Sequence, residues 1–246
     1  MDNHQQIQQY LVGLKLSWMR EHYEALLEEA IKKKSGPLEY FGELLRGEHQ
    51  TRRQRGIERR IKAARFPVEK SLETFNWQWP EQLERQQVEH HAALGFVKKA
   101  ANLVFVGPVG VGKTHLATAI ALNACRKGHK VLYGNTIEAI NDLLAAQKQG
   151  RLKEAIKKYA TPHLLVLDEL GYLPIDKTGA NLLFQIISQR YERGSIILTT
   201  NKAYKDWAEI FSNDSAITSA VLDRLLHHCD TVVIKGKSYR ARKPKK

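Results

Sequence analysis

The stretch GPVGVGKT, residues 107–114, lies between the apolar run ANLVFV and a helical pattern over residues 113–126. It satisfies the G-x-x-x-x-G-K-[ST] pattern of phosphate-binding loops, and its strand–loop–helix context removes most chance matches. The glycines allow backbone N–H groups and a helix N-terminus to surround phosphates. We therefore predict a nucleotide-binding loop, in which Lys113 reaches the β- and γ-phosphates and the Thr114 hydroxyl binds Mg²⁺. The residues of this loop are Gly107, Pro108, Val109, Gly110, Val111, Gly112, Lys113, Thr114 and His115.

Strand and helix patterns alternate from residue 101 onward. Continuous apolar strands joined by helical crossovers indicate a parallel sheet covered on both faces. We therefore predict an α/β P-loop domain over residues 101–246 with a central five-stranded parallel sheet. The expected strands are 101–107, 130–135, 164–170, 195–201 and 231–236, and the expected helices are 113–126, 136–159 with a break near Gly150, 178–193 and 214–228.

The first 66 residues have a different pattern. Apolar residues recur every three to five positions over 7–34, which indicates an amphipathic helix that Gly36-Pro37 ends. A shorter helix is expected over 38–48, and an arginine-rich segment follows it. We predict a small all-helical domain over residues 1–66 with one strongly basic surface, and a connector over residues 67–100.

The formal net charge of the chain is +13, and much of it is clustered. Such an excess predicts a polyanionic partner, most plausibly nucleic acid. The alternative is a generally basic surface that keeps the protein in solution. The candidate DNA-binding residues of the N-terminal domain are Arg52, Arg53, Arg55, Arg59 and Arg60.

The cysteine usage and hydropathy of the chain bear on its compartment. Its two cysteines, Cys125 and Cys229, form no CxxC pair, so neither a disulfide framework nor a metal knuckle is predicted. No apolar run approaches the ~20 residues needed to span a bilayer. Together with the lack of a signal peptide, these features predict a reduced, cytoplasmic setting and no membrane partner.

A second motif, LLVLDEL, covers residues 164–170. Its apolar residues deliver Asp168 and Glu169 to the C-terminal end of a strand, the edge at which open α/β sheets bind ligands. We expect Asp168 to hold Mg²⁺, directly or through water, and Glu169 to orient and polarise the attacking water. The alternative is an ordinary Asp-Glu pair that caps a helix. An adjacent glutamate also favours hydrolysis of ATP over transfer to a small molecule.

Two further polar residues follow later strands. Asn201 ends SIILTTN, where its amide can hold the lytic water or a γ-phosphate oxygen, although Thr-Thr-Asn also begins a helix well. Arg224 lies on an expected helix in LDRLLHH. It either pairs with Asp223 or Glu209 on the surface or reaches the γ-phosphate of a neighbouring subunit as an arginine finger.

Four stretches, GPVGVGKT, LLVLDELGYLP, SIILTTNKAYKDWAEIF and AVLDRLLHHCDTVVIKGKSYR, together resemble the IstB-like ATPases. These are helper proteins of a class of bacterial insertion sequences, and they belong with the DnaC-like helicase loaders and DnaA initiators in the AAA+ group. The resemblance covers essentially the whole chain, and the last two stretches carry most of it. It implies that residues 107–114 are the Walker A loop, Asp168 and Glu169 the Walker B pair, Asn201 sensor 1 and Arg224 the arginine finger.

The resemblance also assigns the segment 136–160 to the helical insertion that lines a DNA path in initiator and loader ATPases. A solvated amphipathic helix is the alternative for this segment. Its basic residues, which suit contacts with DNA phosphates, are Lys148, Arg151, Lys153, Lys157 and Lys158.

The C-terminus departs from the AAA+ pattern. Only about ten residues follow the last expected strand, too few for a helical lid, so we expect no C-terminal lid domain. Arg240 is then the one candidate for sensor 2. The rings of Phe75 and Trp77 either pack on the adenine or belong to the core.

The implied function is that of an ATP-dependent, DNA-binding regulator of transposition that uses ATP and Mg²⁺. Such a protein forms a homo-oligomer with ATP between subunits, grips double-stranded DNA and delivers it to the cognate transposase, and hydrolysis then drives disassembly. One alternative is a DnaC-type loader of a replicative helicase. A second, from another class, is a monomeric P-loop kinase acting on a small molecule.

Overall fold

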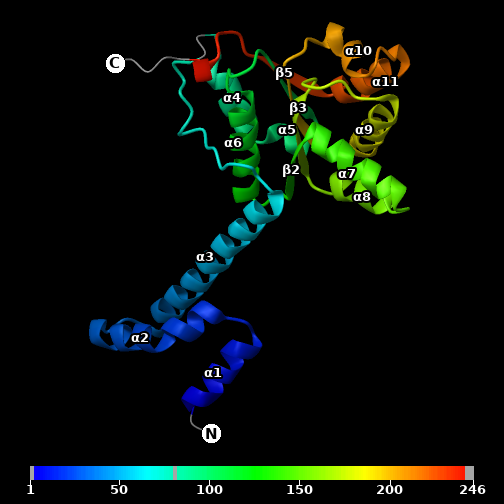
Figure 1. Ribbon diagram of the computed structural model, residues 1–246. Coiled ribbons are helices and arrows are strands. Elements are labelled where there is room, and N and C mark those ends of the chain that lie inside the picture. Colours follow the sequence, from blue (N-terminus) through cyan, green and yellow to red (C-terminus); the bar gives the residue numbers. More distant parts are fainter. Residues whose placement is uncertain (1–2, 80–81, 242–246) are drawn as a thin grey trace. The chain divides into compact units, whose positions relative to one another are not determined.

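The computed structural model describes residues 3–79 and 82–241 (Figure 1). The chain divides into two compact units, Met1–Arg59 and Arg60–Lys246. Within the described residues, no helix is both long and apolar enough to cross a membrane.

The first unit is helical, as predicted. It contains α1 (Asn3–Gly13), α2 (Ser17–Lys33) and most of α3 (Pro37–Ala64). A small core of Leu11, Met19, Tyr23 and Leu44 holds these helices together. Two details of the prediction were wrong. The single helix expected over 7–34 is two helices, and the segments expected to be separate after residue 37 form one continuous α3.

Glu48 of α3 explains why α2 begins where it does. Its buried carboxylate accepts hydrogen bonds from the backbone N–H groups of Trp18 (2.9 Å) and Met19 (3.2 Å), which have no partner within α2. The guanidinium of Arg52 donates to the same carboxylate and to the carbonyl of Lys15, both at 2.7 Å. Because this cap comes from a distant helix, local periodicity over 7–34 could not indicate it.

The second unit is built on a five-stranded sheet with the order β2-β3-β4-β1-β5, in which every neighbouring pair is parallel. The predicted α/β architecture is confirmed. After the last strand, the described residues contain only the short helix η2 (Tyr239–Ala241), so they hold no lid domain. The strands are β1 (Asn102–Val106), β2 (Val131–Asn135), β3 (Leu164–Leu170), β4 (Ser195–Thr200) and β5 (Cys229–Val233). The main crossover helices are α6 (Lys113–Arg126), α7 (Thr136–Lys148), α8 (Leu152–Ala160), α9 (Lys177–Arg190) and α11 (Ser215–Leu226).

These elements agree closely with the expected ranges, and α6 matches its range at both ends. The helical segment after β2 is broken near Gly150, which has a φ of +71°. The last strand begins two residues earlier than expected, at Cys229, because Cys229 pairs with Asn102 at the start of β1. Between β4 and α11 lie η1 (Tyr204–Asp206) and α10 (Trp207–Ile210).

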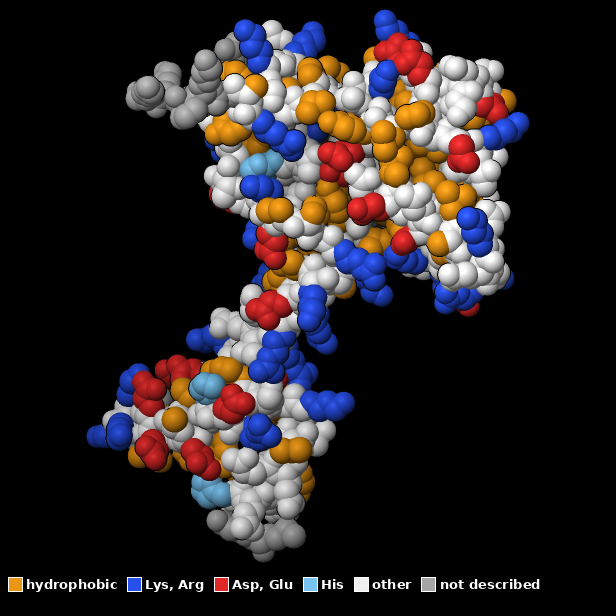
Figure 2. Space-filling model, viewed as in Figure 1, with side chains coloured by type: hydrophobic (Ala, Val, Ile, Leu, Met, Phe, Trp, Pro, Cys, Tyr) orange, Lys and Arg blue, Asp and Glu red, His pale blue; other side chains and the backbone are white. Residues whose placement is uncertain are grey.

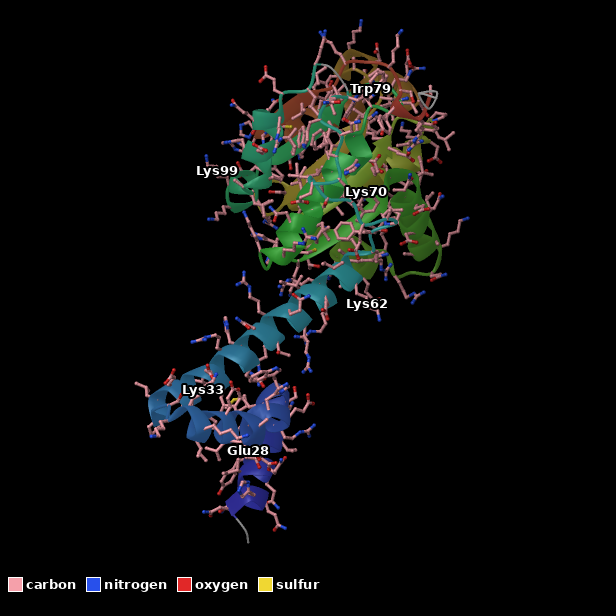
Figure 3. All side chains as sticks on the ribbon, turned by 90° about the vertical axis from the view of Figure 1, so that its left-hand side faces the viewer. Glu28, Lys33, Lys62, Lys70, Trp79 and Lys99 are labelled. Atoms are coloured by element: carbon pink, nitrogen blue, oxygen red, sulfur yellow. The ribbon has the colours of Figure 1, made fainter. Side chains whose placement is uncertain are left out.

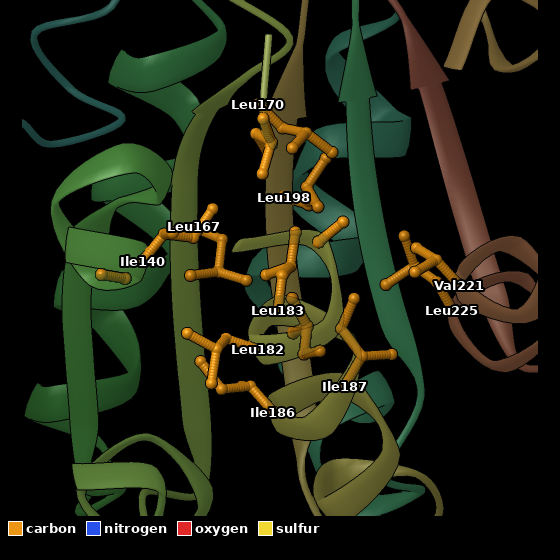
Figure 4. Packing of buried hydrophobic residues seen from close by; sticks show 14 of the residues in the cluster. Ile140, Leu167, Leu170, Leu182, Leu183, Ile186, Ile187, Leu198, Val221 and Leu225 are labelled. Carbon is orange, nitrogen blue, oxygen red and sulfur yellow. The ribbon is translucent and has the colours of Figure 1, made fainter. Parts of the chain in front are cut away.

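The sheet separates two hydrophobic cores, because successive strand residues face opposite sides. On one side, Leu167 and Leu198 pack against α9 residues such as Leu183 and Ile187, and α7, α8 and α11 complete this layer (Figure 4). On the other side, Val166 and its neighbours pack against α6 and the short helices α4 (Arg85–Ala92) and α5 (Gly95–Lys98).

The connector between α3 and α4 crosses the second unit and reaches the loop between β1 and α6, where the ring of Phe75 lies against Gly112. Lys70 and Trp79 lie on this segment (Figure 3). Phe75 is buried in the core beside α6. The segment therefore positions aromatic residues next to the loop that follows β1.

Candidate nucleotide-binding site

The loop between β1 and α6 has the backbone expected of a phosphate-binding loop. Gly110 and Gly112 have φ values of +80° and +100°, a left-handed region that residues with a Cβ rarely adopt. A Cβ on Gly110 would lie 2.1 Å from the hydroxyl of Ser238, and one on Gly112 would lie 2.7 Å from the ring of Phe75. Both positions therefore require glycine for conformation and for space.

Lys113, the first residue of α6, has its ammonium at the mouth of the loop. The Nζ atom donates hydrogen bonds to the carbonyls of Gly107 (2.7 Å) and Pro108 (2.8 Å). Burial lowers the pKa of this ammonium, whereas the carboxylates of Asp168 and Glu169 act in the opposite direction. The side chain is thus placed where a phosphate oxygen can replace the two carbonyls.

Asp168 is 4% exposed, and among the described residues its carboxylate accepts hydrogen bonds only from hydroxyl groups. Thr114 donates to Oδ1 at 3.0 Å, Thr199 of β4 donates to the same oxygen, and Tyr133 of β2 donates to Oδ2. Within this part of the chain the buried carboxylate forms no salt bridge. A buried charge without a cation is costly. A hydroxyl and a carboxylate are ligands that Mg²⁺ prefers, so Thr114 and Asp168 fit this ion.

Glu169 lies at an irregular point of β3, where the register with β4 shifts between Leu167 and Leu170. Its φ of +62° is unusual for a residue other than glycine. The Glu169 N–H donates to the Thr199 hydroxyl at 2.9 Å, and its carboxylate accepts from the Asn135 amide at 2.9 Å. The Thr199 hydroxyl therefore links the backbone of Glu169 to the carboxylate of Asp168. These contacts hold Glu169 exposed beside the loop, in a conformation that costs roughly 1–2 kcal/mol.

A cavity of about 490 Å³ lies over the loop. Its lining includes Lys113, Thr114, Glu169 and Asn201, which the sequence spreads over more than half of the domain. This cavity is large enough for a nucleotide-sized ligand. Glu169 and Asn201 thus share one cavity with Lys113 and Thr114 of the loop.

The C-terminal segment closes the cavity from another side. The N–H of Tyr239 donates to the carbonyl of Gly110 at 2.9 Å, and the indole N–H of Trp79 donates to the carbonyl of Lys237 at 2.9 Å. Tyr239 and Arg240 both line the cavity. Arg240 thereby adds a second cation near Lys113, and its charge also lowers the pKa of Lys113.

The connector fixes the outer side of α6. Phe75 packs edge-on against His115 and Trp77, with ring centroids 5.1 Å and 4.9 Å apart. A ring nitrogen of His115 lies 2.8 Å from the carbonyl of Ser71, and burial lowers the pKa of this imidazole. Phe75 therefore belongs to the core, and it also lines the cavity.

Arg224 lies outside this cavity, on α11. Its guanidinium is 4.6 Å from the ring centroid of Phe184 on α9, and it makes a long hydrogen bond of 3.5 Å to the carbonyl of Ala220. Neither Asp223 nor Glu209, the two surface partners that the sequence suggested, forms a salt bridge with it among the described residues. Within one chain, then, Arg224 does not reach the loop.

The candidate DNA-binding residues divide by their contacts. Arg52 and Arg55 are exposed but also bond within the first unit, and Arg60 donates to the carbonyl of Cys125 at 2.8 Å. Lys158 forms a 2.6 Å salt bridge with Asp142. The remaining candidates are exposed and form no side-chain ion pair within the described chain; Figure 2 shows Lys and Arg side chains over both α3 and the α7–α8 segment. These are Arg53, Arg59, Lys148, Arg151, Lys153 and Lys157.

Sequence reasoning missed Tyr133, Asn135 and Thr199. Tyr133 lies in the middle of β2, whereas Asn135 and Thr199 lie at the C-terminal ends of strands that neighbour β3. A polar residue at such a position was the available signal, and it was used only for Asn201. The strand order that places β2 and β4 on either side of β3 was needed to find the others.

A family model described as IstB-like ATP binding protein matches residues 9–246 of the chain. This chain belongs to the IstB-like ATP-binding proteins. It is 42% identical over 236 residues to the insertion sequence IS21 ATP-binding protein of Pseudomonas aeruginosa, covering 96% of this chain and 89% of that one. It is 35% identical to the insertion sequence IS5376 ATP-binding protein of Geobacillus stearothermophilus, covering 97% and 94% of the two chains.

The fold of this IstB-like protein is similar to that of two solved structures, DnaI and the DnaC helicase loader. The DnaI crystal structure matches with a TM-score of 0.58 at 21% identity, over 67% of this chain and 90% of that chain. The DnaC helicase loader matches with a TM-score of 0.54 at 26% identity, over 72% and 99%. The IstB-like chain therefore has the P-loop AAA+ fold.

Proposed function

We propose that this IstB-like protein is an ATP-dependent DNA-binding regulator of transposition. It binds and hydrolyses ATP, assembles on double-stranded DNA and delivers that DNA to the transposase of its insertion sequence. The observation that carries the ATPase assignment is the placement of Lys113, Thr114 and Glu169 around one cavity, with the Asp168 carboxylate hydrogen-bonded to Thr114 beside it. The names of its insertion-sequence relatives support the role in transposition.

Each side chain of the site has a distinct task in hydrolysis. Lys113 and the loop N–H groups bind the β- and γ-phosphates, and Thr114 with Asp168 holds Mg²⁺. When bound, this ion supplies a Lewis acid that neutralises charge on the phosphates. Glu169 orients and polarises the water that attacks the γ-phosphate, and Asn201 holds that water or a γ-phosphate oxygen.

Arg224 makes the site a shared one in this proposal. Because it does not line the cavity of its own chain, it is available to the nucleotide of a neighbouring subunit. An arginine supplied in this way stabilises the charge of the transition state, by roughly 10³–10⁵ in rate. ATP then favours a homo-oligomer, and hydrolysis favours its disassembly.

DNA binding in this proposal rests on phosphate contacts. The net charge of +13 and the exposed cations of α3, α7 and α8 suit a polyanion. Contacts of this kind are weakly sequence-specific and strongly salt-dependent. The working compartment is the cytoplasm.

One alternative keeps a specific observation in its favour. The fold covers nearly all of the DnaC helicase loader, so a loader role would use the same ATP site. The first unit would then grip a replicative helicase in place of a transposase. Pull-down of the full chain against both partners separates the two functions, since each predicts capture of only one.

The decisive test of the proposal is particle size, measured by light scattering with and without ATP and DNA. We expect a larger assembly only when both are present, and its loss in Lys113→Ala. A chain that stays monomeric under all conditions would contradict the proposal. If Lys113→Ala assembled on DNA as well as the wild type does, assembly would not depend on nucleotide binding, and the ATP-dependent part of the proposal would be wrong.

A further inference from the structure

Tyr133 connects the second strand of the sheet to the proposed metal site. It is 8% exposed, and its hydroxyl donates a hydrogen bond to Oδ2 of Asp168. In the sheet, Tyr133 pairs with Val166, two residues before Asp168 on the neighbouring strand. Both side chains therefore point to the same face, as diagonal neighbours. No general feature of a phosphate-binding loop requires a phenol at this place.

The two oxygens of the Asp168 carboxylate have different partners. Oδ1 accepts from Thr114 and Thr199, which belong to the loop end and to β4. Oδ2 accepts from Tyr133. Oδ1 thus faces the phosphate loop, whereas Oδ2 is held by the Tyr133 hydroxyl from β2. Loss of the phenolic hydroxyl would leave the rotation of the carboxylate restrained on one side only.

The ring of Tyr133 is itself fixed in place. It packs against Phe66 with ring centroids 6.0 Å apart, and it belongs to the core beside α6. A hydroxyl on a fixed ring loses little entropy when it forms its hydrogen bond. Because the packing of its ring fixes the Tyr133 hydroxyl independently of Asp168, this hydroxyl can determine the orientation of the Asp168 carboxylate.

A second cavity, of about 690 Å³, lies beside Tyr133 and Asp168 and is a source of water that could reach the Asp168 carboxylate. Tyr133 and Asp168 both line it, whereas they are not among the residues that line the nucleotide cavity. Thr114 and Glu169 line both cavities. Without the hydroxyl, water from the second cavity would bind Oδ2 and compete with the ordered arrangement at Oδ1.

We propose that Tyr133 is a positioning residue for magnesium binding: its hydroxyl orients the Asp168 carboxylate so that Thr114 and Asp168 bind Mg²⁺ with nucleotide in one arrangement. This inference rests on the proposed function, because it requires that the site bind ATP with Mg²⁺. It assigns to Tyr133 no contact with the nucleotide.

The test compares Tyr133→Phe with the wild-type chain in binding of a fluorescent ATP analogue across a Mg²⁺ titration and in EDTA. We expect the Mg²⁺ concentration that gives half of the metal-dependent gain in affinity to rise about 5- to 10-fold, the effect of one lost hydrogen bond to a carboxylate partly replaced by water. Affinity in EDTA should be unchanged, since the ring and its packing remain.

Tyr159→Phe is the matched control. Tyr159 is also buried, donates its hydroxyl to a carboxylate, that of Asp142 at 2.9 Å, and lines the second cavity. Its removal should leave the Mg²⁺ dependence at the wild-type value. In an Asp168→Asn background, Tyr133→Phe should have no further effect, because the two residues act as one unit.

The outcomes separate this inference from the proposed function. A wild-type Mg²⁺ dependence in Tyr133→Phe overturns the positioning role, as does an equal loss of affinity with and without Mg²⁺, which would mean a packing role. A wild-type chain that binds no nucleotide overturns the proposed function, and the inference with it. Only the selective shift in Tyr133→Phe supports both.

Discussion

The side-chain amide of Asn135 donates a hydrogen bond of 2.9 Å to the carboxylate of Glu169. Asn135 ends β2 and Glu169 lies near the end of β3, and these strands are neighbours in the sheet. The bond holds the proposed catalytic carboxylate through a neutral donor rather than through a cation. Because the Asn135 side chain also accepts a hydrogen bond from the N–H of Ile137, it ties Glu169 to the first residues of α7.

We therefore expect Glu169→Gln to bind ATP normally and to lose roughly 10²–10⁴-fold in hydrolysis, since the amide cannot take part in general-base catalysis. The ATP-bound oligomer should accumulate on DNA, as measured by phosphate release and particle size. Asn135→Ala, which removes only the restraint, should lose less activity. Normal turnover in Glu169→Gln would disprove the assignment of Glu169.

Arg224→Ala should bind ATP as the wild type does and hydrolyse it far more slowly, because Arg224 lies outside its own cavity. Mixing this variant with Lys113→Ala provides the sharper measurement. In mixed oligomers some sites combine an intact loop with an intact arginine from the neighbour, so ATPase activity should partly return. If the mixture remains as inactive as its components, Arg224 does not act between subunits.

The two exposed basic surfaces can be tested separately for DNA binding. Arg53→Glu with Arg59→Glu, and Lys153→Glu with Lys157→Glu, should each weaken binding uniformly over sequences and reduce the salt slope by about 0.9 for each lost phosphate contact. The matched control is Lys98→Glu with Lys99→Glu at the C-terminal end of α5, where both lysines are exposed; Figure 3 labels Lys99. A surface whose variants behave like this control does not contact DNA.

Among the charged residues, Arg190 is the one whose substitution should lower the free energy of unfolding most. It is 1% exposed, and burial lowers its pKa to about 10. Among the described residues its guanidinium donates only to backbone carbonyls. In Arg190→Met these carbonyls lose their donor, which should lower the free energy of unfolding by about 3–5 kcal/mol. Urea unfolding measures this, with exposed Arg193→Met as a control that should change little. The accepting carbonyls belong to Tyr159, Ala160, Pro162, His163 and Ser195.

His91 predicts a dependence of stability on pH. Burial lowers the pKa of this imidazole, opposed by the carboxylate of Asp230 at 3.9 Å and reinforced by His90. Below the ordinary pKa of about 6.5, the unfolded chain takes up a proton that the folded chain does not. Stability should therefore fall as the pH drops from 7.5 toward 5, and less steeply in His91→Gln. His90→Gln, at an exposed neighbour, removes only the smaller contribution of His90 and should reduce the slope less than His91→Gln does.

The parts of the fold that were predictable from sequence are those with a local signal. The range of α6 was predicted at both ends, because an apolar strand, a glycine-rich loop and a helical pattern follow one another. The break before α2 was not, because it depends on the Glu48 carboxylate from another helix. Tertiary contacts override local periodicity at such points.

The candidate site shows the same division. Lys113, Thr114, Asp168 and Glu169 lie in sequence motifs, and the structure places them around one cavity or beside it. Tyr133 came from no motif, since its relation to Asp168 follows from the pairing of β2 with β3. The left-handed backbone of Glu169 likewise depends on an irregular register that sequence pattern does not encode.

The position of β1 between β4 and β5, with Tyr239 bonded to Gly110, has a consequence for protein synthesis. A ribosome makes the GPVGVGKT loop long before the strands and the C-terminal segment that enclose it. Nucleotide therefore cannot guide the early folding of the nascent chain, because the cavity does not yet exist. A prematurely terminated polypeptide that contains the whole loop still lacks a formed site. Only chains that include Tyr239 and its neighbours are then able to enter the proposed ATP-dependent assembly.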